Sequence, residues 1–322
     1  MKIKNFLEKT LGGMMLIPML IGAIIHTFWP NILAYFGPFT NALGTGATVI
    51  IAVWFVGIGA SVKLKATTTV LKKSGILLAT KMFAAFLACI IVQKLIPQGM
   101  VSNGLFAGFS ALAVVAAMDM TNAGLYTALT KQYGTTEEAG ASLLLMIESG
   151  PLFTMIILGT TGLASFPLQN FIGLILPFLL GFILGNLDEE FRVFLTKLNE
   201  PMIIFLGFSL GSTISLHSIY EAGIAGLILA FSVIVFTGFF LILADIFLAK
   251  GNGTAGIAAS STAGAAAATP MLIAQLYPEL REQADYATVL VSTCVVITAF
   301  VVPILTSYYA KWAKTHINKG KL

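Results

Sequence analysis

Apolar segments of about 20 residues, the length that a helix needs to cross a bilayer, follow one another along most of this chain. Inside a bilayer the backbone cannot bond to water, so a spanning segment has to satisfy its own peptide groups, as a helix does. The composition fits such segments, since 57% of the residues are hydrophobic and 10% are charged, against about 25% charged in an ordinary soluble domain. The sequence therefore predicts an all-α polytopic membrane protein.

Ten apolar segments can be placed along the 322 residues, and we number these expected transmembrane helices 1 to 10 in chain order. The first follows three lysines, as the apolar core of a signal peptide does. It is long for a signal peptide and is echoed later in the chain, so we assign it to the mature fold. The expected helices cover residues 11–29, 44–62, 74–95, 104–133, 139–161, 167–186, 200–217, 223–248, 254–278 and 284–310.

Lysine and arginine residues gather on one side of these expected helices. Membrane proteins carry an excess of these residues in their cytoplasmic loops. If the amino terminus is cytoplasmic, fifteen of the eighteen Lys and Arg residues lie inside, and the exceptions are Lys94, Arg281 and Lys81, which falls within helix 3. We therefore expect both termini in the cytoplasm. The net charge of +4 follows from this distribution and does not require a nucleic-acid partner.

The two halves of the chain repeat one another. The segment LIPMLIGAII in helix 1 aligns with ILPFLLGFIL in helix 6, which pairs Gly22 with Gly181. Helices 4 and 9 share several small residues at a constant offset, and the same offset pairs Thr121 with Thr269. The identity is weak but collinear, as expected after an ancient duplication.

Each half, residues 11–161 and residues 167–310, holds five expected helices. Because five is an odd number, the second half must enter the membrane upside down relative to the first. This is the inverted repeat found in many secondary transporters. We expect one transmembrane domain over residues 1–322, with two inverted five-helix repeats and with broken helices 4 and 9 crossing near the middle of the membrane.

Polar and small residues interrupt helix 4 in the segment VVAAMDMTNAGLY and helix 9 in the segment AGIAASSTAGAAAATPMLI. Interrupted helices in matching positions of two repeats mark the substrate site of many transporters. In helix 9, Thr269 and Pro270 form a good helix start, because threonine can cap the first turn and proline has no amide to leave unpaired. Thr121 and Asn122 offer an equivalent start in helix 4. Both starts would direct amides and a positive dipole end at the membrane centre, which favours an anionic substrate such as a carboxylate.

Three hydroxyl side chains, Ser260, Ser261 and Thr262, lie in the break of helix 9. They could bind a polyhydroxylated ligand, or they could bond back to their own helix. The small residues around them allow two backbones to cross at close range. Together with Thr121, Asn122 and Thr269, these hydroxyl residues are our candidates for substrate binding.

Two acids, Asp119 in helix 4 and Glu148 in helix 5, lie where an ionised group is costly, so a functional role is favoured. Glu148 falls about 13 Å into its helix at 1.5 Å per residue, too deep to reach the surface. Removal from water favours the neutral carboxyl group, so either acid could take up a proton at one face and release it at the other. Alternatively, Asp119 accepts amides at a helix start, Glu148 makes a buried structural hydrogen bond, or the acids bind sodium.

Two other charged residues, Lys81 and Asp245, indicate less about function from their positions in the sequence. Lys81 lies within helix 3, where it either extends to the cytoplasmic surface or pairs with the substrate. Asp245 is expected at the inner end of helix 8, near Lys250. The sequence contains no HExxH motif, no serine elbow and no P-loop, so we predict neither an enzyme nor an ATP-driven pump. We expect no cofactor and no metal site.

Long motifs throughout the chain resemble the 2-keto-3-deoxygluconate permease family. The resemblance implies a bacterial inner-membrane symporter that imports 2-keto-3-deoxy-D-gluconate, a sugar-acid monoanion, together with protons. It identifies no individual site residue. The motifs are GGMMLIP (12–18), VVAAMDMTNAGLY (114–126), QYGTTEEAGA (132–141), ESGPLFTMIILGT (148–160), GTAGIAASSTAGAAAATP (253–270) and VPILTS (302–307).

This family is similar in organisation to the bile-acid/sodium symporter superfamily. The similarity implies a core of helices 3–5 and 8–10 and a panel of helices 1, 2, 6 and 7. A proton symporter surrounded by membrane lipid is thus our leading hypothesis. A sodium-coupled carrier of another organic anion is the alternative, followed by a passive channel or a sensor. The oligomeric state and the proton stoichiometry stay open.

Overall fold

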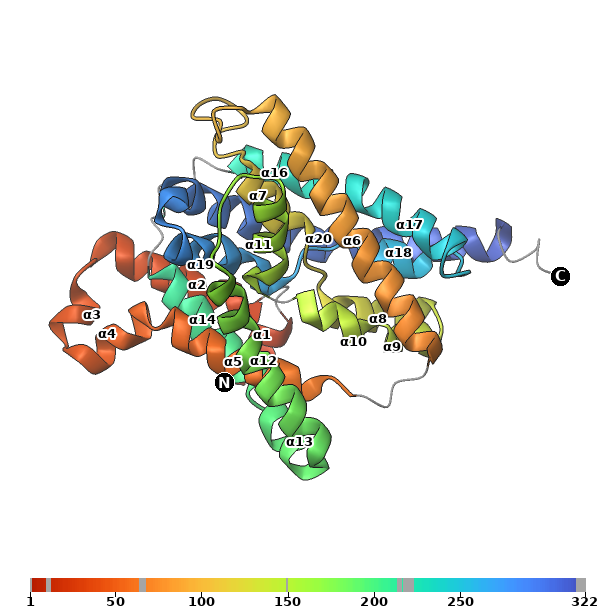
Figure 1. Cartoon of the computed structure of the whole chain (residues 1–322), viewed down its shortest axis with the longest axis horizontal. Helices are drawn as coiled ribbons and strands as arrows, with labels where there is room; N and C mark the ends of the chain where they lie inside the picture. The colour runs from red at the N-terminus through yellow and green to blue at the C-terminus, as the bar shows by residue number, and fades with distance from the viewer. Residues whose placement is uncertain are drawn as a thin grey trace.

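The computed structural model describes residues 2–9, 13–63, 68–148, 150–212, 216 and 223–316, and these residues form helices joined by turns and loops (Figure 1). In this part of the chain, the one β-type contact is an isolated bridge between Met100 and Ser110. The all-α prediction is therefore confirmed. The described residues do not include Ser149 or the tail residues 317–322. Of the expected end of helix 7, residues 213–217, they include Leu216 alone.

The helices form two groups. The first, which we call the panel helices, comprises α1 (Ile3–Lys9), α2 (Gly13–Phe28), α3 (Ile32–Tyr35), α4 (Pro38–Thr45), α5 (Ala47–Ser61), α12 (Leu168–Leu187), α13 (Glu189–Thr196) and α14 (Asn199–Gly211). In these helices α5 packs against α12 and α14, and α14 packs against α2. They occupy the left and the bottom of Figure 1.

The second group, which we call the core helices, surrounds α7 and includes the long helix α6, which runs from the top to the lower right of Figure 1, and α17 on the right. Its members are α6 (Thr68–Leu95), α7 (Ala111–Met118), α8 (Ala123–Tyr133), α9 (Thr136–Gly140), α10 (Ser142–Leu145), the 3-10 turn η1 (Met146–Glu148), α11 (Pro151–Thr160), α16 (Gly223–Ser232), the π-helical turn η2 (Val233–Thr237), α17 (Gly238–Phe247), α18 (Thr254–Ala258), the 3-10 turn η3 (Gly264–Ala268), α19 (Thr269–Leu276), the 3-10 turn η4 (Pro278–Leu280) and α20 (Arg281–His316).

Every residue of α7 is buried, because α6, α11 and α20 pack around it. Its sequence ALAVVAAM is apolar on all faces, as expected of a helix that is surrounded by others. The 36-residue helix α20 also contacts α16, α18 and α19, so it joins both parts of the core. The interrupted segments of the chain are therefore enclosed by long, continuous helices.

Glycines bring the panel helices into close contact at two equivalent places. Gly22 of α2 lies so close to the Phe208 carbonyl group of α14 that a Cβ atom would not fit, and Gly181 of α12 lies in the same way against Val56 of α5. Small residues permit this close approach of helix backbones. The sequence alignment pairs Gly22 with Gly181, so the two contacts occupy corresponding positions of the two halves.

Three described helical segments are long and apolar enough to cross a membrane, namely Thr68–Leu95, Gly223–Phe247 and Pro278–His316. Counting two bent pairs as single spans raises the number to five: α4 with α5, bent by 63°, and α7 with α8, bent by 40°. The remaining apolar helices are shorter. A helical, membrane-type architecture is thus observed, while the number of ten crossings stays a prediction.

The expected helix 5 is wrong as a continuous element. It is divided into α9, α10, η1 and α11, and the last break lies between Glu148 and Pro151. Gly150 has a φ angle of 116°, which few other residues adopt, and Pro151 has no amide with which to continue the preceding turns. Glu148 therefore lies at an interruption and not within a regular helix.

Candidate functional site

The interruptions of the two broken helices meet in the interior. Residues 119–122 separate α7 from α8, and residues 259–263 separate α18 from η3. The backbone amide of Ala263 donates a hydrogen bond to the Met120 carbonyl oxygen over 3.1 Å, and the Thr262 hydroxyl donates to the Ala117 carbonyl oxygen over 2.9 Å. We call these two loops the crossing. The structure thus brings together Thr121, Asn122, Ser260, Ser261 and Thr262.

Asn122 caps α8, as the sequence predicts. Its side-chain oxygen accepts a hydrogen bond from the Leu125 amide over 3.0 Å, and its own amide donates to the Ser261 hydroxyl over 3.3 Å. The amide of Thr121, immediately before this cap, donates to Glu148 Oε2 over 2.6 Å. The Glu148 side chain therefore accepts a backbone amide at the start of α8. Free amides and the helix dipole favour negative charge at such a position.

The hydroxyl residues of the second interruption differ in their contacts. The Ser260 hydroxyl bonds back to the Ile257 carbonyl oxygen of its own helix over 2.7 Å, which is the structural alternative. The Ser261 hydroxyl instead accepts from Asn122 in the first interruption, and the Thr262 hydroxyl donates to Ala117 in the last turn of α7. All three are fully buried. Substrate contact at these residues would require their present hydrogen bonds to rearrange.

The predicted capping role of Thr269 is wrong. The preceding Ala268 already has right-handed helical dihedral angles, because η3 runs directly into α19, so Thr269 is the first residue of the helix and not its cap. Its buried hydroxyl instead faces the sulfur of Met120 over 3.9 Å. Pro270 lies in the first turn of α19 as predicted. Thr269 therefore still contacts the crossing, through Met120.

The two acids have different partners. Glu148 contacts Thr121, whereas Asp119 Oδ2 accepts a hydrogen bond from the Thr154 hydroxyl of α11. Asp119 follows the last residue of α7 and does not accept amides at a helix start, which excludes that alternative in this conformation. One buried oxygen of each acid, Asp119 Oδ1 and Glu148 Oε1, has no hydrogen-bond partner among the described residues.

Lys81 lies at the crossing. The alternative in which its side chain extends to the cytoplasmic surface is therefore wrong in this conformation. Lys81 is fully buried, and its ammonium group donates to the Ala259 carbonyl oxygen over 2.9 Å and to the Ser261 carbonyl oxygen over 2.7 Å. The interruption of the second broken helix exposes these carbonyl groups to α6. An ionisable residue deep in an apolar span was the signal in the sequence.

Thr154 and the break at Gly150 were also missed by the sequence reasoning. Glycine followed by proline is a strong signal for a break, and the segment ESGP contains it. Thr154 follows the same break by one helical turn, which places its hydroxyl beside Asp119. No feature of the sequence singled out this threonine from the other threonines of the chain.

The break that holds Glu148 lies at the boundary between the core and panel helices, where Gly150 contacts the panel. The ring of Phe55 from α5 covers Gly150 so closely that a Cβ atom there would collide with it. Phe55 and Pro151 line a cavity of about 250 Å³ between α5, α12, α11 and α19. At its edge the Thr48 hydroxyl donates to Gln275 Oε1 over 2.6 Å, which links the two groups of helices.

Asp245 belongs to a second buried ionic cluster. It was expected at the membrane surface near Lys250, but it is fully buried and lies 2.9 Å from the ammonium group of Lys73. The same ammonium group lies 2.5 Å from Glu138 Oε1, and Asp245 Oδ2 also accepts the Gly253 amide over 2.9 Å. This cluster ties together α6, α9, α17 and the start of α18.

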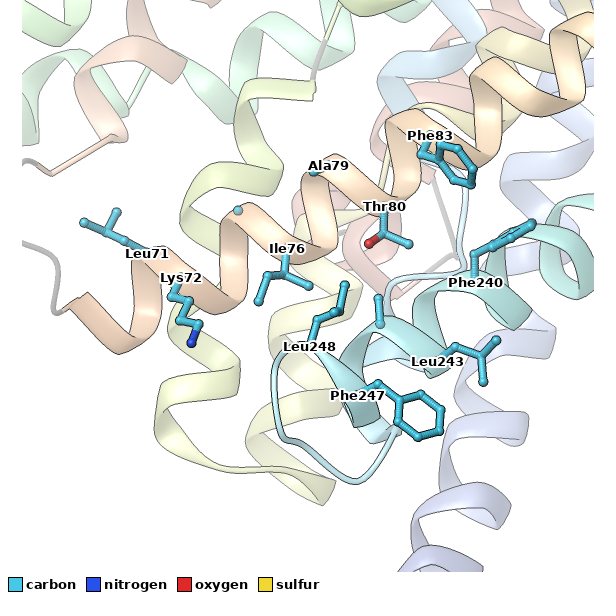
Figure 2. Close-up of a pocket in the computed structure, with 12 residues that line it drawn as sticks. Leu71, Lys72, Ile76, Ala79, Thr80, Phe83, Phe240, Leu243, Phe247 and Leu248 are labelled. Carbon is cyan, nitrogen blue, oxygen red and sulfur yellow. The ribbon is translucent and has the colours of Figure 1, made fainter.

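A larger groove of about 700 Å³ runs between α6 and α17 (Figure 2). Its lining is mostly aliphatic and aromatic, with Phe83, Phe240 and Phe247 among the side chains drawn. Lys72 and Thr80 are its polar side chains among the described lining residues. None of the candidate substrate residues lines it, so we place the site at the crossing.

Comparison with known proteins gives one consistent result. Residues 4–315 match the family model described as 2-keto-3-deoxygluconate permease. Curated relatives of the same name from Escherichia coli O157:H7 and from Escherichia coli strain K12 / DH10B are each 53% identical to the chain over 319 residues. The alignments cover 99% of this chain and 98% of each relative.

Proposed function

Because the chain belongs to the 2-keto-3-deoxygluconate permease family, we propose that it imports 2-keto-3-deoxy-D-gluconate across a bacterial inner membrane by proton symport. Its relatives are named permeases, and permeases are transporters and not enzymes.

The observation that carries the proposal is the carboxylate of Glu148 at the start of α8. The Thr121 amide already holds one carboxylate in a buried position, and the substrate presents the same group. We propose that the substrate carboxylate binds here when Glu148 moves away. Thr121, Asn122, Ser261, Thr262, Ser260 and Thr269 would supply the surrounding polar contacts once the crossing opens.

We propose that ten transmembrane helices form two inverted repeats, residues 11–161 and 167–310, with both termini in the cytoplasm. The equivalent contacts at Gly22 and Gly181 support this symmetry. The core helices would rock against the panel helices and expose the crossing first to one side and then to the other. The cavity at Phe55 and Pro151 lies on the boundary along which this movement would occur.

For the coupling proton we propose Glu148, with Asp119 as the second candidate. Glu148 contacts the amide that would receive the substrate, so its protonation and substrate binding concern the same atoms. Asp119 contacts Thr154 on the far side of the first interruption. Both acids are buried, and the ammonium group of Lys81 bonds to carbonyl groups of the same crossing.

The proposal can be tested with purified protein in liposomes and labelled 2-keto-3-deoxygluconate. We expect a pH gradient, acid outside, to drive accumulation by the unchanged protein. In Glu148→Gln we expect counterflow to persist while accumulation is lost, because glutamine cannot exchange a proton. Asp119→Asn distinguishes the second acid, and Glu190→Gln, at an exposed position of α13, is the control.

Three results would contradict the proposal at different levels. Accumulation that survives both acid substitutions would show that neither acid carries the proton. Accumulation that disappears when choline replaces sodium at fixed pH would favour a sodium-coupled carrier. Equilibration without accumulation under every ion gradient would favour a passive channel.

A further inference from the structure

The groove between α6 and α17 is apolar along most of its length and carries Lys72 at one end (Figure 2). We propose that it binds one acyl chain of an anionic phospholipid, with the negatively charged headgroup at Lys72. Such binding goes beyond the proposed transport and depends neither on proton symport nor on the crossing. The proposed topology places the start of α6 in the cytoplasm, so the lipid would come from the inner leaflet.

A single face of α6 forms one wall of the groove. Its lining residues recur every three or four positions, which places them in one row along the helix. They are Lys72, Gly75, Ile76, Ala79, Thr80 and Phe83. A Cβ atom at Gly75 would meet open space, and Phe240, Leu243 and Phe247 of α17 form the opposite wall. The two helices therefore leave an open apolar channel between them.

The groove has the length of one membrane leaflet. The 28 residues of α6 extend about 42 Å, against about 30 Å of hydrocarbon, so a centred helix passes beyond the hydrocarbon by about 6 Å at each end. Lys72 lies about 6 Å from the start of α6, at the edge of the hydrocarbon. Phe83 lies about 16 Å further along, close to the bilayer centre at about 15 Å. This span fits one acyl chain inserted from one leaflet.

Aromatic rings bound the deep end of the groove, at the opposite end from Lys72 (Figure 2). The rings of Phe83 and Phe240 pack edge to face with their centroids 5.7 Å apart, and Phe240 packs in the same way against Phe236 over 5.3 Å. These rings join α6 to α17 where the groove ends. The channel therefore has one polar end and one apolar end, as a phospholipid has.

The charge of Lys72 is available to a headgroup. Lys72 is exposed and forms no ion pair with a described residue, whereas the neighbouring Lys73 is buried between Glu138 and Asp245. Basic residues at the cytoplasmic membrane surface attract anionic lipids. Phosphatidylglycerol carries a net negative charge and phosphatidylcholine carries none. The groove should therefore select the first lipid over the second, although it could hold the acyl chains of both.

Native mass spectrometry of the purified protein tests this selection. The unchanged protein is released from detergent after incubation with equal amounts of phosphatidylglycerol and phosphatidylcholine that have the same acyl chains. We expect the first bound lipid to be phosphatidylglycerol about five times more often, the factor that one lysine near the membrane surface contributes. Equal retention of the two lipids would mean ordinary lipid contact without selection and would overturn the proposal.

Lys72→Gln tests the headgroup contact. We expect this variant to retain the two lipids equally, because glutamine has no charge for the headgroup. Lys94→Gln is the matched control, since Lys94 is exposed at the other end of the same helix and does not line the groove. It should keep the preference of about fivefold. An equal loss of preference in both variants would assign it to the overall charge of the protein and would contradict a site at Lys72.

Gly75→Leu tests the acyl-chain contact independently of the charge. The leucine side chain would enter the open space of the groove without a collision at its Cβ atom, so the fold should persist. We expect a loss of retention for both lipids. Gly223→Leu at the start of α16, where a Cβ atom also meets open space, is the control and should retain lipid like the unchanged protein. Undiminished phosphatidylglycerol retention by Gly75→Leu would overturn the assignment of the acyl chain to this groove.

Discussion

Two clusters of buried charged side chains meet at one helix, α6, in the part of the chain that the structure describes. Lys81 bonds to carbonyl groups at the crossing, whereas Lys73 lies between Glu138 and Asp245. Both lysines are buried, but only the cluster of Lys73 contains direct ion pairs in the described part of the chain. We propose that the first cluster exchanges a proton, whereas the ion pairs of the second hold neighbouring elements together.

Replacement of Lys73 tests this division at the scale of a single residue. Lys73→Met leaves two buried carboxyl groups without their cation, and removal of one member of a buried ion pair costs about 3–5 kcal/mol. We expect a matching loss in the free energy of unfolding, measured in detergent by denaturant titration. Lys72→Met on the exposed side of the same helix is the control, and an equal effect of both substitutions would refute a special role for Lys73.

The interrupted elements place the site, and the sequence located two of the three interruptions. Helices 4 and 9 contain polar residues or runs of small residues, so their breaks could be inferred and their meeting expected. The break after Glu148 was missed although Gly150 and Pro151 signal it, because the surrounding residues are apolar enough to fill a membrane span. The position of Lys81 could not be inferred either, since it depends on which face of α6 meets the second interruption.

Contacts between distant segments explain the remaining differences. The start of α19 looked like a threonine cap, but η3 runs into it because packing holds Ala266 and Ala267 in a buried turn. Likewise, Asp245 forms an ion pair with Lys73, which is far away in the sequence. The spacing of apolar residues along the chain carries no information on such pairs. The helical class and the regions of the breaks could be predicted, but the hydrogen-bond partners could not.

Gly150 provides a test at the scale of the element. Its positive φ angle is one that residues with a Cβ atom rarely adopt, and a Cβ atom would collide with the ring of Phe55, so Gly150→Ala should destabilise the start of α11. Backbone strain of this kind costs about 1–3 kcal/mol. The comparison is Gly159→Ala in the same helix, where a Cβ atom would find ordinary contacts 3.8 Å away.

We expect Gly159→Ala to be neutral or slightly stabilising, and Gly150→Ala to lower both the melting temperature and the transport rate. Thermal unfolding in detergent and counterflow in liposomes measure the two effects. Equal melting temperatures for these variants would show that the break at Gly150 is not a constraint on the fold.

In the whole molecule, the core and panel helices meet at the cavity beside Phe55 and at the hydrogen bond between Thr48 and Gln275. The crossing lies inside the core and is closed in this conformation, since its hydroxyl residues are fully buried. Substrate can reach it only if these helices move. Rocking of the core against the panel would break the contact between Thr48 and Gln275 in each transport cycle.

The most direct measurement is therefore transport by a protein in which this contact is locked. Thr48→Cys and Gln275→Cys would be introduced after replacement of the two buried cysteines, Cys89 and Cys294, and joined by a short thiol-specific cross-linker that a reductant removes. The control pair is Gln93→Cys with Thr161→Cys, two positions within the core whose side chains are 3.0 Å apart.

We predict that cross-linking the first pair stops both counterflow and pH-driven accumulation of 2-keto-3-deoxygluconate, and that the reductant restores them. Cross-linking the control pair should leave transport in place, because both of its residues would move together. Undiminished transport with the panel and core joined at residues 48 and 275 would contradict the proposed movement.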